Sequence, residues 1–524
     1  MHLQVEFALV MSETYNNSRI AKNTLYLYIR SILIMGVSIY TSRVVLQALG
    51  VSDYGIYNVV GGFVGMFSLL SSAMTSASQR FISYEMGKKK PQMNRLFCGT
   101  ISIHIILAVV VFLILESFGL WFLNSQMNID SDRLLATNWV FQCSVFSFCI
   151  NIISIPYNAT IIAHEKMNVF AIISVYEVLA KLGIVYLLWL THLDKLIIYA
   201  ILVFVVSLSL RMIYGIYCSR HFSECKFKFT IDKELFKSML SFTGWNFFGT
   251  TAGIFSTQGI NILVNIFYGV VLNAARGISE QVNAAINTFV TNFMTALNPQ
   301  ITQSCAAGNY KYMNSLIIRG GKYAALLYWS ISLVVFVESD YILSVWLVEV
   351  PEYASLFLRL ALVYSVFSAL SHTLYIAILA TGKIKIYQII MGSINFLSFI
   401  LCYIGYLCGA SPEWCYISTI IIAVILVLVR LKLLSVYIPE FSGIEYFKKS
   451  IMKVFFVIMI SIAAEYLIRH YIILNGIMQF LTSFIVALFI MPFVIYMIAL
   501  DQKERFWIKS KIQGKSQSIK KFFQ

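Results

Sequence analysis

The chain has 524 residues, of which 59% are hydrophobic and 12% are charged, with a formal net charge of +15 and a mean hydropathy of +0.79. Soluble domains carry about 25% charged residues, so a single soluble globular domain is excluded. The basic residues lie mainly in short connections between long apolar segments. This charge pattern indicates membrane topology rather than nucleic-acid binding.

About 14 apolar segments are long enough to cross a bilayer as helices, which takes about 20 residues each. The segments are continuously apolar rather than alternating, which favours helices over a barrel. In chain order they are expected at 24–48, 54–78, 97–122, 134–158, 167–190, 196–217, 238–267, 271–299, 317–338, 354–379, 385–408, 414–436, 451–472 and 477–500.

Charge alternates from one connection to the next. Lys88, Lys226 and Lys448 belong to basic connections, and the residues after 500 form a basic tail, whereas the opposite connections carry acids such as Asp194. Cytoplasmic loops retain Lys and Arg, so both termini are predicted to be cytoplasmic. The first ten residues lack the features of a cleavable signal peptide, and Met11 is an alternative start.

The chain repeats itself at an offset of about 220 residues. The run 75–79 followed by Gly87 is echoed by the run 295–300 followed by Gly308, and Gly50 and Gly269 precede the second and eighth segments. Six spans separate the copies, so the halves have the same orientation and predict a substrate site between them. The prediction is an all-α integral membrane protein with two pseudo-symmetric six-helix lobes plus two C-terminal helices.

The predicted division has five parts. They are an N-terminal lobe (1–217), a cytoplasmic linker (218–237), a C-terminal lobe (238–436), two extra transmembrane helices (437–500) and a basic cytoplasmic tail (501–524).

Ionisable residues inside a membrane span are costly and usually face a bundle interior or a wet cavity. The candidate substrate-binding residues are Arg30, Arg43, Lys181 and Arg276. Arg30 and Arg43 have an alternative interpretation as interface residues near the ends of the first span. Arg276 belongs to a helix so polar, from Asn273 to Asn287, that a wet face is expected.

Two acids are candidates for ion coupling. Glu177 and Glu280 each lie four residues from a basic candidate, Lys181 and Arg276, and so share a helix face with it. The Glu177–Lys181 pair could instead be structural. Cations outnumber acids among the candidates, which suits an anionic substrate, and Arg can bind a phosphate through two parallel hydrogen bonds.

No catalytic motif is recognisable: the sequence has no phosphate-binding loop, no HExxH and no convincing nucleophile and base. The prediction is therefore a protein that is not an enzyme and uses no cofactor or metal. The nine cysteines form no C-x-x-C and are interpreted as apolar packing residues, with a Cys408–Cys415 disulfide as the alternative.

The stretches 19–24, 40–45 and 49–57, together with Pro299, Gln300 and Gly308, resemble the O-antigen type polysaccharide flippases. These belong to the multidrug/oligosaccharidyl-lipid/polysaccharide exporter superfamily. The resemblance implies a bacterial inner-membrane protein that flips undecaprenyl-pyrophosphate-linked oligosaccharide repeat units to the periplasmic leaflet by alternating access. It implies a cationic cavity, in which Arg30, Arg43 and Arg276 are the candidates.

The resemblance also implies the partners: the lipid-linked oligosaccharide, membrane lipids, and, as candidates, the polysaccharide polymerase and chain-length machinery, with no nucleic acid. Three alternatives stay open. A lipid II flippase shares the mechanism. A cation-coupled multidrug antiporter usually has an acid in its N-terminal lobe, and the first two spans contain none within the membrane. A membrane polymerase or acyltransferase is the third alternative, and a long outer catalytic loop would favour it.

Overall fold

The computed structural model describes residues 2–125, 131–226, 228–230, 232–347, 350–471, 475–502 and 504–506. Within these ranges the regular structure is helical, and eleven helices are long and apolar enough to cross a membrane. The other three predicted segments lie in two long helices, α1 (His2–Leu49) and α9 (Lys233–Ala306). The prediction of an all-α, many-pass membrane protein is therefore confirmed.

The chain forms two compact units. Unit 1 comprises 1–254, 292–313 and 376–393, and unit 2 comprises 255–291, 314–375 and 394–524. Helix α9 therefore contributes its two ends to unit 1 and its middle to unit 2. The predicted lobe boundary at 218–237 stays a prediction.

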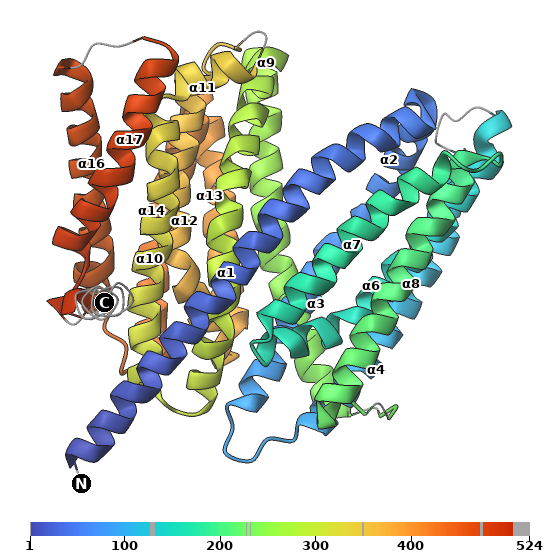
Figure 1. The fold of residues 1–524 in the computed structure, drawn as a ribbon, viewed down its shortest axis with the longest axis horizontal. Coiled ribbons are helices and arrows are strands. Elements are labelled where there is room, and N and C mark those ends of the chain that lie inside the picture. Colours follow the sequence, from blue (N-terminus) through green and yellow to red (C-terminus); the bar gives the residue numbers. More distant parts are fainter. Residues whose placement is uncertain are drawn as a thin grey trace, which may run out of the picture. The chain divides into compact units, whose positions relative to one another are not determined.

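Helix α6 (Leu134–Ala163) is the centre of unit 1. It packs against α2 (Val51–Gly65), α3 (Ser68–Met86), α4 (Met93–Ile114) and α8 (Lys195–His221), while α1 packs along α7 (Met167–Leu188) (Figure 1). Residues Val140, Phe141, Val145 and Ile152 of α6 are fully buried. Burying such side chains contributes about 1.5–3 kcal/mol each.

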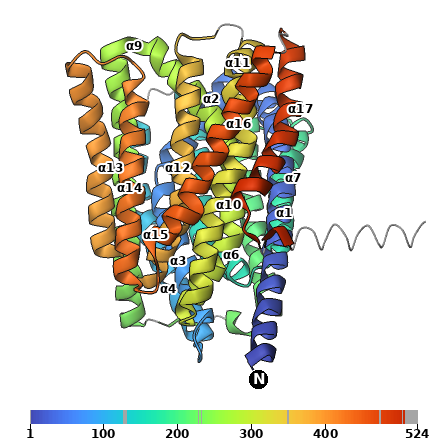
Figure 2. The same cartoon turned by 90° about the vertical axis from the view of Figure 1, so that its left-hand side faces the viewer.

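Unit 2 contains α11 (Ser339–Trp346), α14 (Trp414–Tyr437), α15 (Gly443–Tyr446), α16 (Met452–Tyr471), α17 (Ile477–Val494) and most of α10 (Tyr310–Val337), α12 (Ala354–Thr381) and α13 (Ile384–Leu407). Helices α16 and α17, the pair predicted to lie outside the repeat, run side by side (Figure 2). The Trp329 indole N–H of α10 donates to the Ser461 hydroxyl of α16 at 2.9 Å. The appended pair is thus fastened to α10.

Backbone geometry carries the predicted repeat. Gly50 has φ 81° between α1 and α2, and Gly269 has φ 83° where it interrupts α9. A second pair follows the ends of α6 and α12, at Glu165 (φ 56°) and Gly382 (φ 77°). Left-handed backbone costs about 1–2 kcal/mol for a residue with a Cβ, so glycine is expected at such positions. Glu165 is the exception among these four.

Side chains carry the repeat as well. The Asn94 amide of α4 donates to the carbonyl oxygen of Glu224 at 2.8 Å, and the Asn314 amide of α10 donates to that of Glu440 at 2.8 Å. Each asparagine therefore holds the chain that leaves the last helix of its own half. The sequence has a Met-Asn pair at 93–94 and another at 313–314, and their asparagines act at equivalent places in both halves.

Candidate functional site

The structure brings Arg30, Glu177 and Lys181 together in unit 1, because α1 lies along α7. The Arg30 guanidinium lies 4.5 Å from the centre of the Phe170 ring. Lys181 Nζ donates to Glu177 Oε1 at 2.6 Å. Glu177 and Tyr214 of α8 are close enough to Arg30 to interact with it electrostatically. These residues form a partly exposed cluster with two cations and one acid.

The Arg30 side chain keeps unused hydrogen-bonding capacity. Its Nε is buried and has no hydrogen-bond partner among the described residues. Lys181 and Glu177 are 42% and 38% exposed, so the cluster is open on one side. A guanidinium N–H beside an open cluster can donate to an anionic oxygen. The side chain of Arg43, the other candidate of α1, lies outside the part of the chain that the structure describes.

Arg276 lies in unit 2 and is only 3% exposed. Its guanidinium is 5.6 Å from the centre of the Tyr416 ring of α14. Neither Nε nor Nη1 has a hydrogen-bond partner among the described residues, although both atoms are buried. Glu280, one turn along α9, instead accepts a hydrogen bond from the Tyr416 hydroxyl at 2.9 Å. The Tyr416 side chain thus lies against both predicted residues.

The polar run after Arg276 is mostly satisfied by the protein itself. Asn283 is 5% exposed, and its Oδ1 accepts from Tyr328 at 2.6 Å, Ser365 at 2.8 Å and Asn287 at 3.0 Å. The wet face expected from composition is therefore filled, at Asn283, by side chains of α10 and α12. Composition could not reveal this, because the partners lie far away in sequence.

Four helix ends meet within unit 1. Gln303 of α9 donates to the Ala163 carbonyl oxygen at the end of α6 at 2.8 Å. Arg80 of α3 donates to the carbonyl oxygens of Leu379 at 3.2 Å and Ala380 at 3.1 Å, near the end of α12. In repeat terms, α3 corresponds to α9 and α6 to α12, so each half caps a helix of the other. We call this arrangement the reciprocal junction.

Glu165 lies at the centre of the reciprocal junction. Its carboxylate accepts from Arg19 Nε at 2.6 Å and from Gln300 Nε2 at 3.2 Å, and Tyr312 donates to Gln300 Oε1 at 2.9 Å. Arg19 and Gln300 belong to two of the segments that carried the family resemblance. The sequence interpretation missed Glu165, although an acid at the place where the other half has Gly382 is a usable signal.

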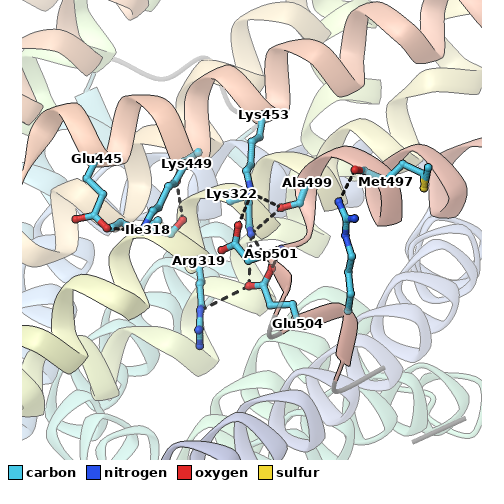
Figure 3. Close-up of polar contacts among 12 residues, drawn as sticks. Ile318, Arg319, Lys322, Glu445, Lys449, Lys453, Met497, Ala499, Asp501 and Glu504 are labelled. Carbon is cyan, nitrogen blue, oxygen red and sulfur yellow. Dashed lines mark hydrogen bonds and ion pairs between the residues drawn. The ribbon is translucent and has the colours of Figure 1, made fainter. Parts of the chain in front are cut away.

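A second charged cluster lies at the end of unit 2 and fastens the chain after α17 (Figure 3). Lys322 Nζ of α10, whose side chain is 1% exposed, donates to the Ala499 carbonyl oxygen at 3.0 Å and to Glu504 Oε2 at 3.0 Å. Lys453 of α16 donates to Ala499 and to Asp501. Burial raises the pKa of Asp501, but the hydrogen bond from Lys453 and the charge of Lys322 outweigh it, so this pKa lies below its usual value.

None of these clusters has the composition of a metal centre. In the described ranges no group of three or more His, Cys, Asp or Glu side chains could hold a metal ion. All nine cysteines are unpaired, including Cys408 and Cys415.

Two family models match the sequence. The model described as polysaccharide biosynthesis protein covers residues 20–305, and the MatE model covers residues 252–404. No curated protein matches the chain.

Solved transporter structures share the fold. One is a multidrug resistance MATE family transporter of the MOP superfamily in an outward-facing conformation, with a TM-score of 0.66 and 11% identity over 80% of this chain and 96% of that chain. Another is a MOP superfamily transporter from Pyrococcus furiosus, for which a reversed polarity of the binding pocket is described, with a TM-score of 0.65 and 12% identity over 80% and 96%. A MATE in the straight conformation gives 0.66 and 11% over 80% and 97%.

At these identities the structures show a common fold, and the sequence model supplies the family. Because the polysaccharide biosynthesis protein model matches more than half of the chain, the chain belongs to that family, within the multidrug/oligosaccharidyl-lipid/polysaccharide exporter superfamily of multi-pass membrane transporters.

Proposed function

We propose that this transporter flips undecaprenyl-pyrophosphate-linked oligosaccharide repeat units from the cytoplasmic to the periplasmic leaflet of the bacterial inner membrane, for surface polysaccharide synthesis. The observation that carries the proposal is Arg276, a buried guanidinium with two nitrogens that have no partner among the described residues. The family match supports the polysaccharide part of the proposal.

The chemistry of Arg276 fits a pyrophosphate. A buried charge without partners is costly, and an anionic ligand that accepts hydrogen bonds removes that cost on binding. The guanidinium has a planar fork of donors that matches two phosphate oxygens. Arg30, with a buried Nε that also has no partner in the described part of the chain, offers the same chemistry in unit 1. Lys181 adds a second positive charge beside it.

Alternating access supplies the movement, and the reciprocal junction is its gate at the end predicted to be cytoplasmic. Arg80 and Gln303 bind carbonyl oxygens at helix ends, and Gln300 and Arg19 bind Glu165. These are individual hydrogen bonds of about 0.5–1.5 kcal/mol each, or about 1.5–3 kcal/mol where a charge takes part. Such contacts can break and reform during each transport cycle. Glu177 and Glu280 are the candidates for ion coupling.

The test is complementation with a chemical readout. Cells lacking the gene receive the wild type, Arg276→Ala, or Arg359→Ala as a matched control, and membrane levels of each protein are compared. Arg359 is an arginine of the same unit whose guanidinium is already bound by Ser339 and Asp340. Surface polysaccharide and the cytoplasmic-leaflet pool of lipid-linked repeat units are then measured.

The wild type and Arg359→Ala are expected to restore surface polysaccharide, while Arg276→Ala leaves the lipid-linked intermediate accumulated. If the deletion strain keeps its surface polysaccharide and becomes more susceptible to drugs, the proposal is wrong and the protein is a multidrug antiporter. Accumulated lipid II with arrested cell-wall growth would replace it by a lipid II flippase.

A further inference from the structure

Two buried acids lie where the appended helices meet α10. Glu338, directly after α10, and Glu465 of α16 are each 2% exposed. Arg469 lies four residues after Glu465 on the same face of α16, and its Nη2 lies 3.7 Å from Glu338 Oε2, so both acids lie near one guanidinium. Neither belongs to the candidate substrate site, and Glu465 lies outside the two repeated halves. Two carboxylates in one buried site repel each other strongly. The state in which one of the two carboxyl groups carries a proton is therefore favoured over the state in which both are ionised.

The surroundings of the two carboxyl groups differ. Glu338 accepts hydrogen bonds from Gln479 Nε2 at 3.2 Å and from the Ser483 hydroxyl at 2.8 Å, both on α17. Arg469 Nη2 lies 3.7 Å from Glu338 Oε2. The Glu338 carboxylate oxygens are therefore satisfied by donors of α16 and α17.

Glu465 has no such support. Its Oε1 is buried and has no hydrogen-bond partner in the described part of the chain. The charged groups near Glu465, among the described residues, are Glu338 and Arg469. The facing polar groups of α17, Gln479 and Ser483, do not titrate and donate to Glu338. An unpartnered buried carboxyl oxygen beside an ionised carboxylate is best satisfied by a proton.

We propose that Glu338 and Glu465 form a proton-binding site, with the proton on the Glu465 carboxyl and the negative charge on Glu338. Release of the proton breaks the Glu465 O–H bond and leaves two carboxylates in one buried place. Their repulsion weakens the attachment of α16 and α17 to α10. The attachment of the appended pair therefore depends on proton binding, whatever substrate the transporter carries.

The test is infrared difference spectroscopy of the full-length protein in lipid nanodiscs, with the pH raised from about 5 to about 9, a range that covers displaced carboxyl groups. The wild type is expected to lose a protonated-carboxyl C=O band, and Glu465→Gln is expected to lack that change. Glu352→Gln is the matched control, because Glu352 is an exposed acid of unit 2. This variant should lose the band on raising the pH, as the wild type does.

A second measurement follows thermal unfolding of the same proteins. Folded Glu465 holds a proton that the unfolded chain releases, so wild-type stability should fall as the pH rises, whereas Glu465→Gln should show a flatter profile. Glutamine imitates the protonated acid, so Glu465→Gln should fold. A loss of the band in Glu465→Gln as large as in the wild type when the pH is raised, failure of this variant to fold, or loss of the wild-type band on adding sodium at constant pH would each overturn the proposal.

Discussion

At the residue scale, two buried cations of unit 2 are in opposite situations. Lys322 is 1% exposed and is bonded to the Ala499 carbonyl oxygen and to Glu504. Arg276 is 3% exposed and has two nitrogens without partners among the described residues. A fully paired buried charge contributes to structure, whereas one without partners lowers stability until a ligand binds. Sequence alone does not distinguish them, because Ala499 and Glu504, which bind Lys322, lie far away in the sequence.

This contrast predicts different effects of the same substitution. Arg276→Met should leave stability unchanged or raise it by about 1–2 kcal/mol, because it removes a buried guanidinium with two nitrogens that have no partner among the described residues, and it should abolish transport. Lys322→Met should lower stability, because it leaves Glu504 without that partner. Thermal unfolding in detergent measures both. If Arg276→Met lowers thermal stability as much as Lys322→Met does, Arg276 is a structural residue.

At the element scale, α10 and the residue that follows it form a docking surface for the appended pair. Lys322, Trp329 and Glu338 bind the chain from α16 onward. At corresponding positions of the first half, 220 residues earlier, Val109 and Phe118 are 52% and 53% exposed. The second half thus has a buried Trp and a buried Glu where the first half has exposed apolar residues. This difference between the two repeats is visible in the sequence and marks the docking face.

The fastening at Lys322 predicts energetic coupling. Glu504→Gln should destabilise the protein by about 3 kcal/mol, because it leaves a buried ammonium group without its charged partner. Lys322→Met combined with Glu504→Gln should cost less than the two single changes together. Thermal unfolding of the four proteins completes the double-mutant cycle. Additive effects would mean that the two side chains do not depend on each other.

Gly87, at the end of α3, allows a test of the reciprocal junction by substitution. A Cβ at this position would lie 2.7 Å from the Ala306 Cβ and still closer to the Gln303 carbonyl oxygen. Gly87→Ala should therefore part the ends of α3 and α9 and increase thiol labelling of Cys305, which is buried in the wild type. Gly61→Ala is the control, because its Cβ would meet no atom within 4 Å. Equal labelling of Cys305 in both variants would show that the junction tolerates the methyl group.

At the scale of the whole molecule, the helices and the repeat could be predicted, because hydropathy and local motifs determine them. Gly50 and Gly269 adopt matching left-handed conformations at the predicted turns. The polar contacts could not be predicted. Glu165 binds Arg19 and Gln300, and Tyr416 binds Glu280, and no spacing rule joins positions so far apart. The Glu177–Lys181 pair could be predicted, because both residues lie four positions apart on one helix.

The predicted orientation is open to a direct check. Cys408 is the one exposed cysteine of the nine, and it follows α13 in a connection predicted to face outward. A membrane-impermeant maleimide should label Cys408 in intact cells, and Cys408→Ser should remove that labelling. Labelling that requires broken cells would reverse the topology and place the termini outside.

The reciprocal junction bears on how the two halves of the chain recognise each other. Arg80 binds Leu379 and Ala380, and Gln303 binds Ala163, so each contact joins a segment before the 218–237 connection to one after it. None of these bonds needs the covalent connection itself. A chain expressed as two separate polypeptides, divided within that connection, is therefore expected to reassemble through these contacts.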